Sequence, residues 1–135
     1  MTLTERQARL IERVNALGDC LDQYHYLITC AGKLPLMAPE HRTGTYLVKG
    51  CQSKVWLYLR DENGRLYMEA DSDALTLKGV LSLLVELVNG AALDEIAHME
   101  FNFLQQTELS VSFTSERMVG MRSVMDRITA FASGS

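Results

Sequence analysis

The sequence predicts an α+β domain in which helices cover a small three-stranded antiparallel sheet. Two observations predict this class. Between Lys54 and Ala70, apolar and polar residues alternate around Asn63-Gly64, a strong short-range signal for a hairpin turn. On both sides of that stretch, apolar residues recur at the spacing of amphipathic helices. The order helices, strands, helices within 135 residues favours one domain over 1–135.

Two helices are expected before the sheet. Thr2 or Thr4 can cap the first, which ends near Gly18, and Asp19 can cap the second, which ends at Gly32. We expect the two to form a helical hairpin, followed by an irregular surface connection over residues 35–44. Their predicted apolar stripes are Leu10, Ile11, Val14 and Leu17 in the first helix, and Leu21, Tyr24, Leu27, Ile28 and Ala31 in the second.

The hairpin has a testable register. If Asn63 and Gly64 are the turn residues, the facing pairs are Glu62–Arg65, Arg60–Tyr67, Leu59–Met68, Tyr58–Glu69 and Leu57–Ala70. Residues 46–49 can supply the third strand, across a tight turn at Gly50 and Cys51.

Three helices are expected after the sheet. Ser72 or Asp73 is predicted to cap the first, whose apolar residues between 75 and 88 occupy nearly its whole circumference, which places it at the centre of the domain. A short helix follows from Leu93 to about His98. Thr114 or Ser115 caps the last, whose buried stripe is Met118, Met121, Val124, Met125 and Ile128.

Composition argues against several classes of partner and location. Lys and Arg number 13 against 17 Asp and Glu, a net charge of -4, and no basic stripe indicates a nucleic-acid partner. The longest apolar run, residues 74–88, contains Lys78 and Glu86 and is shorter than the roughly 20 residues that span a bilayer. The charged N-terminal segment is unlike a signal peptide, so we expect a cytoplasmic protein without a membrane partner. Three cysteines in such a compartment do not predict disulfides.

Cys51 is the candidate reactive residue. Gly50 permits a sharp turn that presents the next side chain, and Lys49 and Lys54 supply positive charge that favours thiolate, the form that attacks sulfur. The alternative is a small buried apolar residue at the start of a strand, which is what free cysteine usually is.

Four segments resemble the SufE family, in order and at compatible spacing. The first is the loop Gly50-Cys51-Gln52-Ser53-Lys54-Val55-Trp56-Leu57. The others are Tyr24-His25-Tyr26-Leu27-Ile28 with Gly32-Lys33-Leu34-Pro35, then Asp71-Ser72-Asp73-Ala74 with Lys78-Gly79, and finally Ser115-Glu116-Arg117 with Gly120. Cys20, Cys30 and the pair Met118-Val119 depart from the expected pattern.

The resemblance implies a fold similar to IscU-type scaffolds and a function in sulfur relay. Cys51 would accept persulfide sulfur from a pyridoxal-phosphate-dependent cysteine desulfurase of the SufS or CsdA type, stimulate that desulfurase, and pass the sulfur to an assembly complex like SufBCD. The chain itself would hold no cofactor, since pyridoxal phosphate belongs to the desulfurase. Gly50, Gln52, Ser53, Lys54, Asp71, Asp73 and Arg117 are carried over as supporting or partner-binding residues.

Arg117 is a candidate functional residue for a physical reason that is independent of the resemblance. A cation in the first turn of a helix opposes the helix dipole. We expect it to form an anion site for the Cys51 thiolate or for an acidic group of the partner, or else to pair sideways with an exposed carboxylate. For Asp71 and Asp73, capping of the following helix is the preferred explanation.

Two other functions remain open. In a hydrolase, one of His25, His41 and His98 would activate Cys51, but none stands in a recognisable signature with it. A cluster scaffold would need several cysteines around one site, whereas Cys20 and Cys30 lie ten residues apart on a predicted helix. The histidines and cysteines show no metal-ligand spacing, so no metal site is predicted.

Overall fold

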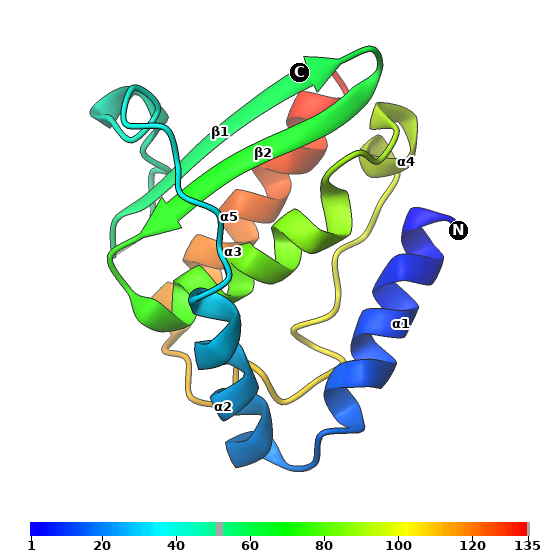
Figure 1. Ribbon diagram of the computed structural model, residues 1–135, viewed down its shortest axis with the longest axis vertical. Coiled ribbons are helices and arrows are strands. Elements are labelled where there is room, and N and C mark those ends of the chain that lie inside the picture. Colours follow the sequence, from blue (N-terminus) through cyan, green and yellow to red (C-terminus); the bar gives the residue numbers. More distant parts are fainter. Residues whose placement is uncertain (51–52, 135) are drawn as a thin grey trace.

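The computed structural model describes residues 1–50 and 53–134. A hairpin lies against α3 and α5, while α1 and α2 pack on the other side of α3 (Figure 1). The α+β fold class is confirmed. The elements in chain order are α1 (Leu3–Asn15), α2 (Cys20–Ala31), the 3-10 helix η1 (Gly44–Tyr46), β1 (Val55–Glu62), β2 (Arg65–Ser72), α3 (Leu75–Val88), α4 (Leu93–Ala97) and α5 (Ser115–Ala132).

The hairpin has the predicted register. Leu57 faces Ala70, Leu59 faces Met68 and Glu62 faces Arg65. Asn63 and Gly64 turn the chain with φ of 55° and 81°, as a two-residue hairpin turn requires. The inner face of the hairpin is apolar and packs on α3 and α5, so burial on one face explains why the register is well specified.

The predicted third strand is reduced to a single antiparallel bridge. Leu47 pairs with Trp56, and the Val48 amide donates to the Val55 carbonyl at 2.8 Å. The preceding residues coil into η1 instead of extending, so over residues 46–49 the strand prediction is wrong beyond this one bridge. Among the described residues, the sheet therefore has two strands.

Helix α3 is the centre of the core, as the apolar residues around nearly its whole circumference predict. Nine of its residues are buried, among them Leu77, Leu81 and Leu84. At Gly79 the helix comes so close to α2 that an added Cβ would lie 2.7 Å from Leu27 Cγ and closer still to the Leu27 carbonyl oxygen. This glycine lets the two helices approach each other closely.

The first two helices begin at the predicted caps. Thr2 forms a capping box with Glu5, and Asp19 forms one with Asp22. The two helices do not pack along each other as the expected hairpin, however. They diverge from their connection (Figure 1), and the irregular segment 98–114 lies between them.

Two buried glutamines hold that irregular segment in place. The Gln7 side chain donates to the Glu100 carbonyl and accepts from the amides of Asn102 and Phe103. Gln23 accepts from the Glu108 amide at 2.7 Å. Because these amides have no regular secondary structure to satisfy them, the two side chains replace it.

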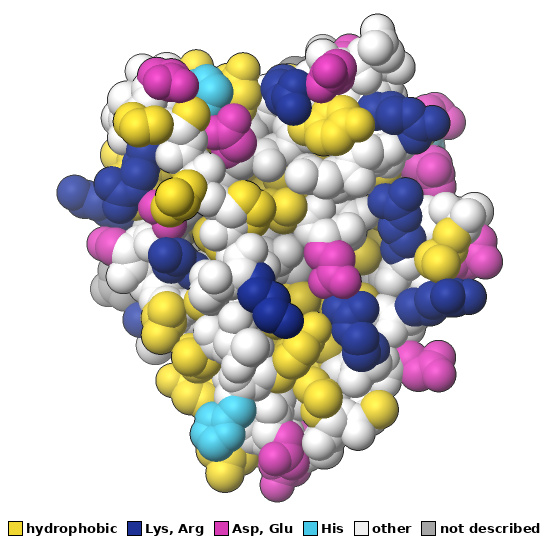
Figure 2. All heavy atoms as spheres, viewed as in Figure 1, with side chains coloured by type: hydrophobic (Ala, Val, Ile, Leu, Met, Phe, Trp, Pro, Cys, Tyr) yellow, Lys and Arg dark blue, Asp and Glu magenta, His cyan; other side chains and the backbone are white. Residues whose placement is uncertain are grey.

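The surface carries no obvious zone of single charge on the face in view. Figure 2 shows acidic and basic side chains interspersed there. Within the part of the chain that the structure describes, no helix has both the length and the hydropathy needed to cross a bilayer.

Candidate functional site

The candidate cysteine lies between Gly50 and Ser53, which the structure describes. Cys51 and Gln52 themselves lie outside the described residues. Gly50 is exposed with φ of 90°, a backbone conformation that favours glycine, and a Cβ there would lie 3.8 Å from Ser123 Oγ on α5. Ser53 is half-buried and leads into Lys54. The segment therefore starts against α5 and returns to the hairpin at Lys54.

The backbone of Lys54 is fixed by Ser72, the last residue of β2, and by Asp73, which follows it. Its amide donates to Asp73 Oδ1 at 3.0 Å, and its carbonyl accepts from the Ser72 hydroxyl at 2.8 Å. The Asp73 amide also donates to the Lys54 carbonyl, at 3.2 Å. The lysine itself is exposed at this junction.

Neither Ser72 nor Asp73 caps α3, so that prediction is wrong. Ala74 is the N-cap residue, and no side chain accepts a capping hydrogen bond there. The Asp73 carboxylate turns back to the Lys54 amide instead, and the Ser72 hydroxyl accepts from the Ala74 amide, just outside the helix. The two side chains therefore join the loop to the helix, which capping by either would not have done.

Asp71 points to the outer face of the hairpin. Its carboxylate accepts from Arg42 Nε at 2.7 Å and lies 3.7 Å from Lys78 Nζ. The Arg42 guanidinium lies over the Trp56 ring, 3.9 Å from its centroid. The structure does not pair Asp71 with Asp73, because the two interact with different groups.

A contact between His41, Tyr58 and Glu69, here called the clasp, holds the connection before η1 to the same outer face of the hairpin. His41 stacks on Tyr58 with ring centroids 3.6 Å apart, and its Nδ1 lies 3.0 Å from Glu69 Oε1. Burial raises the pKa of Glu69, but the hydrogen bonds from His41 and from the Ala38 amide outweigh it and lower the pKa below its ordinary value. Sequence reasoning missed this clasp because the connection has no periodicity to reveal its partners.

Arg117 occupies the first turn of α5, as expected. Thr114 caps this helix by accepting from the Arg117 amide at 3.2 Å. The guanidinium Nη1 donates to the Thr76 hydroxyl of α3 at 3.2 Å. Among the described residues, no carboxylate lies within 4.0 Å of that guanidinium, so the predicted sideways ion pair is not found.

Arg117 lines a surface pocket of about 430 Å³ between α2, the end of segment 98–114 and the starts of α3 and α5. Its walls include Leu21 and Tyr24, which sequence analysis placed in the buried stripe of α2 but which are 60% and 37% exposed. Val111 is also exposed there. The remaining lining residues are Cys20, Thr76, Glu108, Leu109 and Ser112.

The other two cysteines lie at opposite ends of α2. Cys20 is exposed, whereas Cys30 is buried, and its burial raises the pKa of its thiol. Across residues 1–50 and 53–134, no group of three or more His, Cys, Asp or Glu side chains is arranged to hold a metal ion.

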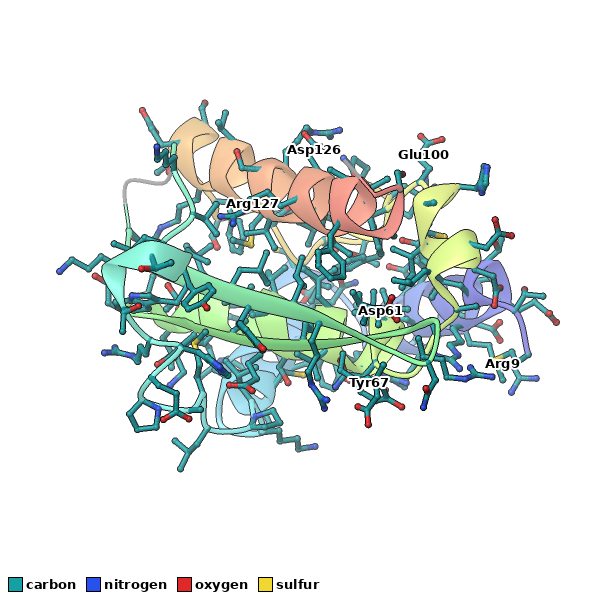
Figure 3. The ribbon with its side chains drawn as sticks, turned by 90° about the horizontal axis from the view of Figure 1, so that it is seen from above. Arg9, Asp61, Tyr67, Glu100, Asp126 and Arg127 are labelled. Atoms are coloured by element: carbon teal, nitrogen blue, oxygen red, sulfur yellow. The ribbon has the colours of Figure 1, made fainter. Side chains whose placement is uncertain are left out.

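Residues around α5 also position the other root of the candidate loop. Figure 3 shows Arg127 on the side of α5 that faces the hairpin and Asp126 on the outer side. Arg127 Nη1 lies 3.5 Å from the Leu47 carbonyl, next to the Val48–Val55 hydrogen bond. Both ends of the cysteine segment are thus fixed by backbone contacts with hairpin and helices.

Comparisons with known proteins agree on one family. The family model described as "SufE: Fe-S metabolism associated domain" matches residues 8–132. The chain is 32% identical over 123 residues to an uncharacterized SufE-like protein of Synechocystis sp., covering 91% of this chain and 77% of that protein. It is 33% identical over 125 residues to an uncharacterized SufE-like protein of Rhizobium etli, covering 89% and 84% respectively.

A solved structure has a similar fold. The solution structure of a hypothetical protein from Thermus thermophilus superposes with a TM-score of 0.79 at 21% identity, covering 96% of this chain and 94% of that one. At that identity the likeness concerns the fold alone.

Proposed function

The chain belongs to the SufE family, whose domain is associated with Fe-S metabolism, and from that premise we propose that Cys51 is a persulfide sulfur acceptor. The observation that carries the proposal is the family match over residues 8–132, which includes this cysteine. The contacts on either side of the segment support it, because the Val48–Val55 hydrogen bond and the Lys54–Asp73 hydrogen bond hold the chain shortly before and just after the cysteine in the sequence.

The chemistry is thiol exchange. The Cys51 thiolate attacks the terminal sulfur of a persulfide on the donor's cysteine, so one S–S bond forms as the other breaks and the donor's cysteine leaves as a thiolate. No net oxidation or reduction accompanies the step. Exposed Lys49 and Lys54 lie on either side of the attacking residue, and positive charge there favours its thiolate form.

The donor we propose is a pyridoxal-phosphate-dependent cysteine desulfurase, whose cofactor releases sulfur from free cysteine. The recipient is an iron–sulfur cluster assembly complex, and the chain thereby acts as a carrier and activator of the desulfurase. We place this exchange in the cytoplasm, where thiols are kept reduced.

Arg117 provides the electrostatic part of the proposal. Its half-buried side chain lines the pocket near the start of α3, and among the described residues the guanidinium donates to a neutral hydroxyl, that of Thr76. A cation without an internal counter-ion is suited to an acidic group that a partner brings. We propose that Arg117 meets such a group, or the Cys51 thiolate itself, when the desulfurase docks.

Mass spectrometry tests the proposal directly. The protein is incubated with a pyridoxal-phosphate-loaded cysteine desulfurase and cysteine, and its intact mass is followed before and after reduction. We expect the gain of sulfur at Cys51, reversed by reductant, and loss of that gain in Cys51→Ser. The Cys20→Ser variant is the matched control, since it removes an exposed thiol elsewhere and should still load.

Other outcomes would point to the alternatives. Sulfur that loads normally on Cys51→Ser would refute the assignment of the acceptor. Iron or a cluster that stays bound through gel filtration would favour a scaffold, and cysteine-dependent hydrolysis of an ester or amide without any sulfur loading would favour an enzyme.

A further inference from the structure

Few polar side chains are buried in the described residues, and they fall into two pairs. These are Gln7, Gln23, Ser72 and Thr76. The two glutamines hold segment 98–114, as described above. Ser72 and Thr76 are only 4% and 8% exposed and lie on either side of the residue that caps α3. Burying a hydroxyl is unfavourable unless its hydrogen bonds are satisfied, so each of these two calls for a partner.

Ser72 is bonded to the root of the cysteine loop. Its hydroxyl donates to the Lys54 carbonyl at 2.8 Å and accepts from the Ala74 amide at 3.1 Å. The hydroxyl is therefore satisfied in both directions, and it links the last loop residue to the residue that caps α3. Asp73 reinforces the same junction through the Lys54 amide.

Thr76 is bonded to the arginine of α5. Its hydroxyl accepts from Arg117 Nη1 at 3.2 Å, which fixes the direction of a long and otherwise flexible side chain. Val could fill the same volume without the hydroxyl, and α3 otherwise consists mainly of aliphatic residues. A hydroxyl at this buried position is thus explained by what it bonds rather than by packing.

We infer that Ser72 and Thr76 together form a hydroxyl bridge that sets the position of Lys54, the residue at which the chain returns from the Cys51 segment to the hairpin, relative to Arg117. The two hydroxyls lie four residues apart, Ser72 at the end of β2 and Thr76 in the first turn of α3, and each bonds one of the two groups. Both are positioning residues, because neither needs to touch the sulfur. The inference rests on the proposed function and adds residues on which its rate depends.

The hydroxyl bridge also explains why the contacts converge on this helix. Helix α3 packs against α2 and β2 and is held on several sides. Lys54 is bonded to the two residues just before the N-cap residue of α3 and Arg117 to the first turn of that helix, so both groups are held by the same rigid part of the structure. A docking partner would therefore meet Lys54 and the Arg117 guanidinium at a preset separation.

Paired substitutions at Thr76 separate positioning from packing. Thr76→Val keeps the shape and removes the acceptor, whereas Thr76→Ser keeps the hydroxyl and removes a methyl group. With Cys51 sulfur loading by a cysteine desulfurase as the assay, we expect Thr76→Val to raise the acceptor KM by about three- to tenfold, the scale of one lost hydrogen bond. Its kcat and thermal midpoint should change little, and Thr76→Ser should restore most of the KM.

Substitution of Ser72 is expected to act on the loop itself. Ser72→Ala removes the shorter of the two hydrogen bonds to the Lys54 carbonyl and leaves only the one from the Asp73 amide, whereas Ser72→Thr keeps a hydroxyl as the rescue variant. In a background where Cys20 and Cys30 are replaced by serine, we expect Ser72→Ala to slow sulfur loading by about three- to tenfold. Alkylation of Cys51 by neutral iodoacetamide should become faster, because loss of a hydrogen bond at Lys54 lowers the free energy of local opening of the adjoining segment.

The results can fail in separable ways. If both Ser72→Ala and Thr76→Val load sulfur like the starting protein and alkylate at the same rate, the hydroxyl bridge is not a positioning device. Equal losses in Thr76→Val and Thr76→Ser, each accompanied by a lower thermal midpoint, would show that packing alone matters and would also overturn the inference. Absence of loading in the starting protein refutes the proposed function, and with it this inference, even if the alkylation rates respond.

Discussion

Replacing Gly79 by alanine tests the close contact between α2 and α3. In an open helix this change stabilises, because alanine is about 1 kcal/mol more favourable than glycine in a helix interior. Here the new Cβ would lie 2.7 Å from Leu27 Cγ and 2.8 Å from Leu27 Cδ1, and the Leu27 carbonyl oxygen is closer still. The side chain can rotate away, but a backbone carbonyl inside α2 cannot do so alone. The helix as a whole has to move.

The size of the effect follows from that movement. To restore ordinary van der Waals contact, α2 must retreat by roughly 0.7 to 1 Å, and a gap of that size forfeits about a quarter to a half of each affected contact. Overpacking of this kind typically costs about 1–3 kcal/mol. After subtraction of the helix-propensity gain of about 1 kcal/mol, we expect the free energy of unfolding to fall by up to about 2 kcal/mol, and the thermal midpoint to fall by up to about 10 °C.

Urea and thermal unfolding, followed by circular dichroism, measure this change. Gly44→Ala is the control, since an added Cβ there has nothing within 4 Å. Its stability should stay within about 0.5 kcal/mol of the starting protein. If Gly79→Ala instead raised the unfolding free energy by the amount that helix propensity alone predicts, the reasoning from the α2–α3 contact would be refuted.

Three further predictions concern the described residues. Gln23→Met removes the hydrogen bonds of a buried side chain to Asn15, Gly18 and Glu108, and should lower the unfolding free energy by about 3 kcal/mol in urea titrations. Gln106 is exposed, so Gln106→Met is the control and should change the unfolding free energy little. Cys20 should react with a thiol reagent such as DTNB well before Cys30, whose thiol is buried and has a raised pKa; single-cysteine variants measured in native buffer and in urea show the difference. The pKa of Glu69 is lower in the folded protein than its ordinary value of 4.5, so the ionised carboxylate should stabilise the fold fully above pH 4.5. This stabilisation should disappear as the pH falls through the lower pKa of the folded protein. The unfolding free energy of Glu69→Gln should therefore differ most from that of the starting protein above pH 4.5 and least in stronger acid.

Each of these has a clear contrary result. Equal stability of the two methionine variants would mean that segment 98–114 does not depend on Gln23. Equal reaction rates of the two cysteines in native buffer would contradict the burial of Cys30. A stability difference for Glu69→Gln that stays the same from neutral pH into strong acid would show that this carboxylate does not form the clasp with His41.

Local signals predicted the parts of the fold that local chemistry decides. The turn at Asn63-Gly64 set the hairpin register, because side chains alternate with a period of two and one face is apolar. Thr2, Asp19 and Thr114 cap their helices because each cap needs only its own helix end.

Local sequence signals could not predict the contacts between residues that lie far apart in the sequence. Ser72 and Asp73 have the composition of caps, yet bond Lys54 eighteen or nineteen positions away. Leu21 and Tyr24 fit the apolar stripe of α2, but that stripe is wider than the surface its neighbours cover. Only the packed structure shows which competing partner a polar group takes.

The same limit applies to the candidate site. The sequence indicated Arg117 through its unfavourable place in a helix, and the structure places it there. Its partner Thr76 could not have been predicted, because a threonine in an apolar helix gives no sign of what its hydroxyl bonds. The roles of Cys51 and Gln52 stay predictions, since both lie outside the described residues.

The hydrogen bond between Val48 and Val55 closes the segment that contains the cysteine into a short loop. Six residues, 49–54, separate the tied positions, and a chain of that length extends at most about 20 Å. Because the Val48–Val55 hydrogen bond holds the two ends of this loop together, none of its backbone atoms can lie much more than about 10 Å from that bond, whatever path the chain follows. If the chain accepts sulfur as proposed, a donor whose sulfur lies deeper than this below its surface must carry it outward on a mobile segment of its own. The Val48–Val55 hydrogen bond would then limit the part of the distance that this chain can cover.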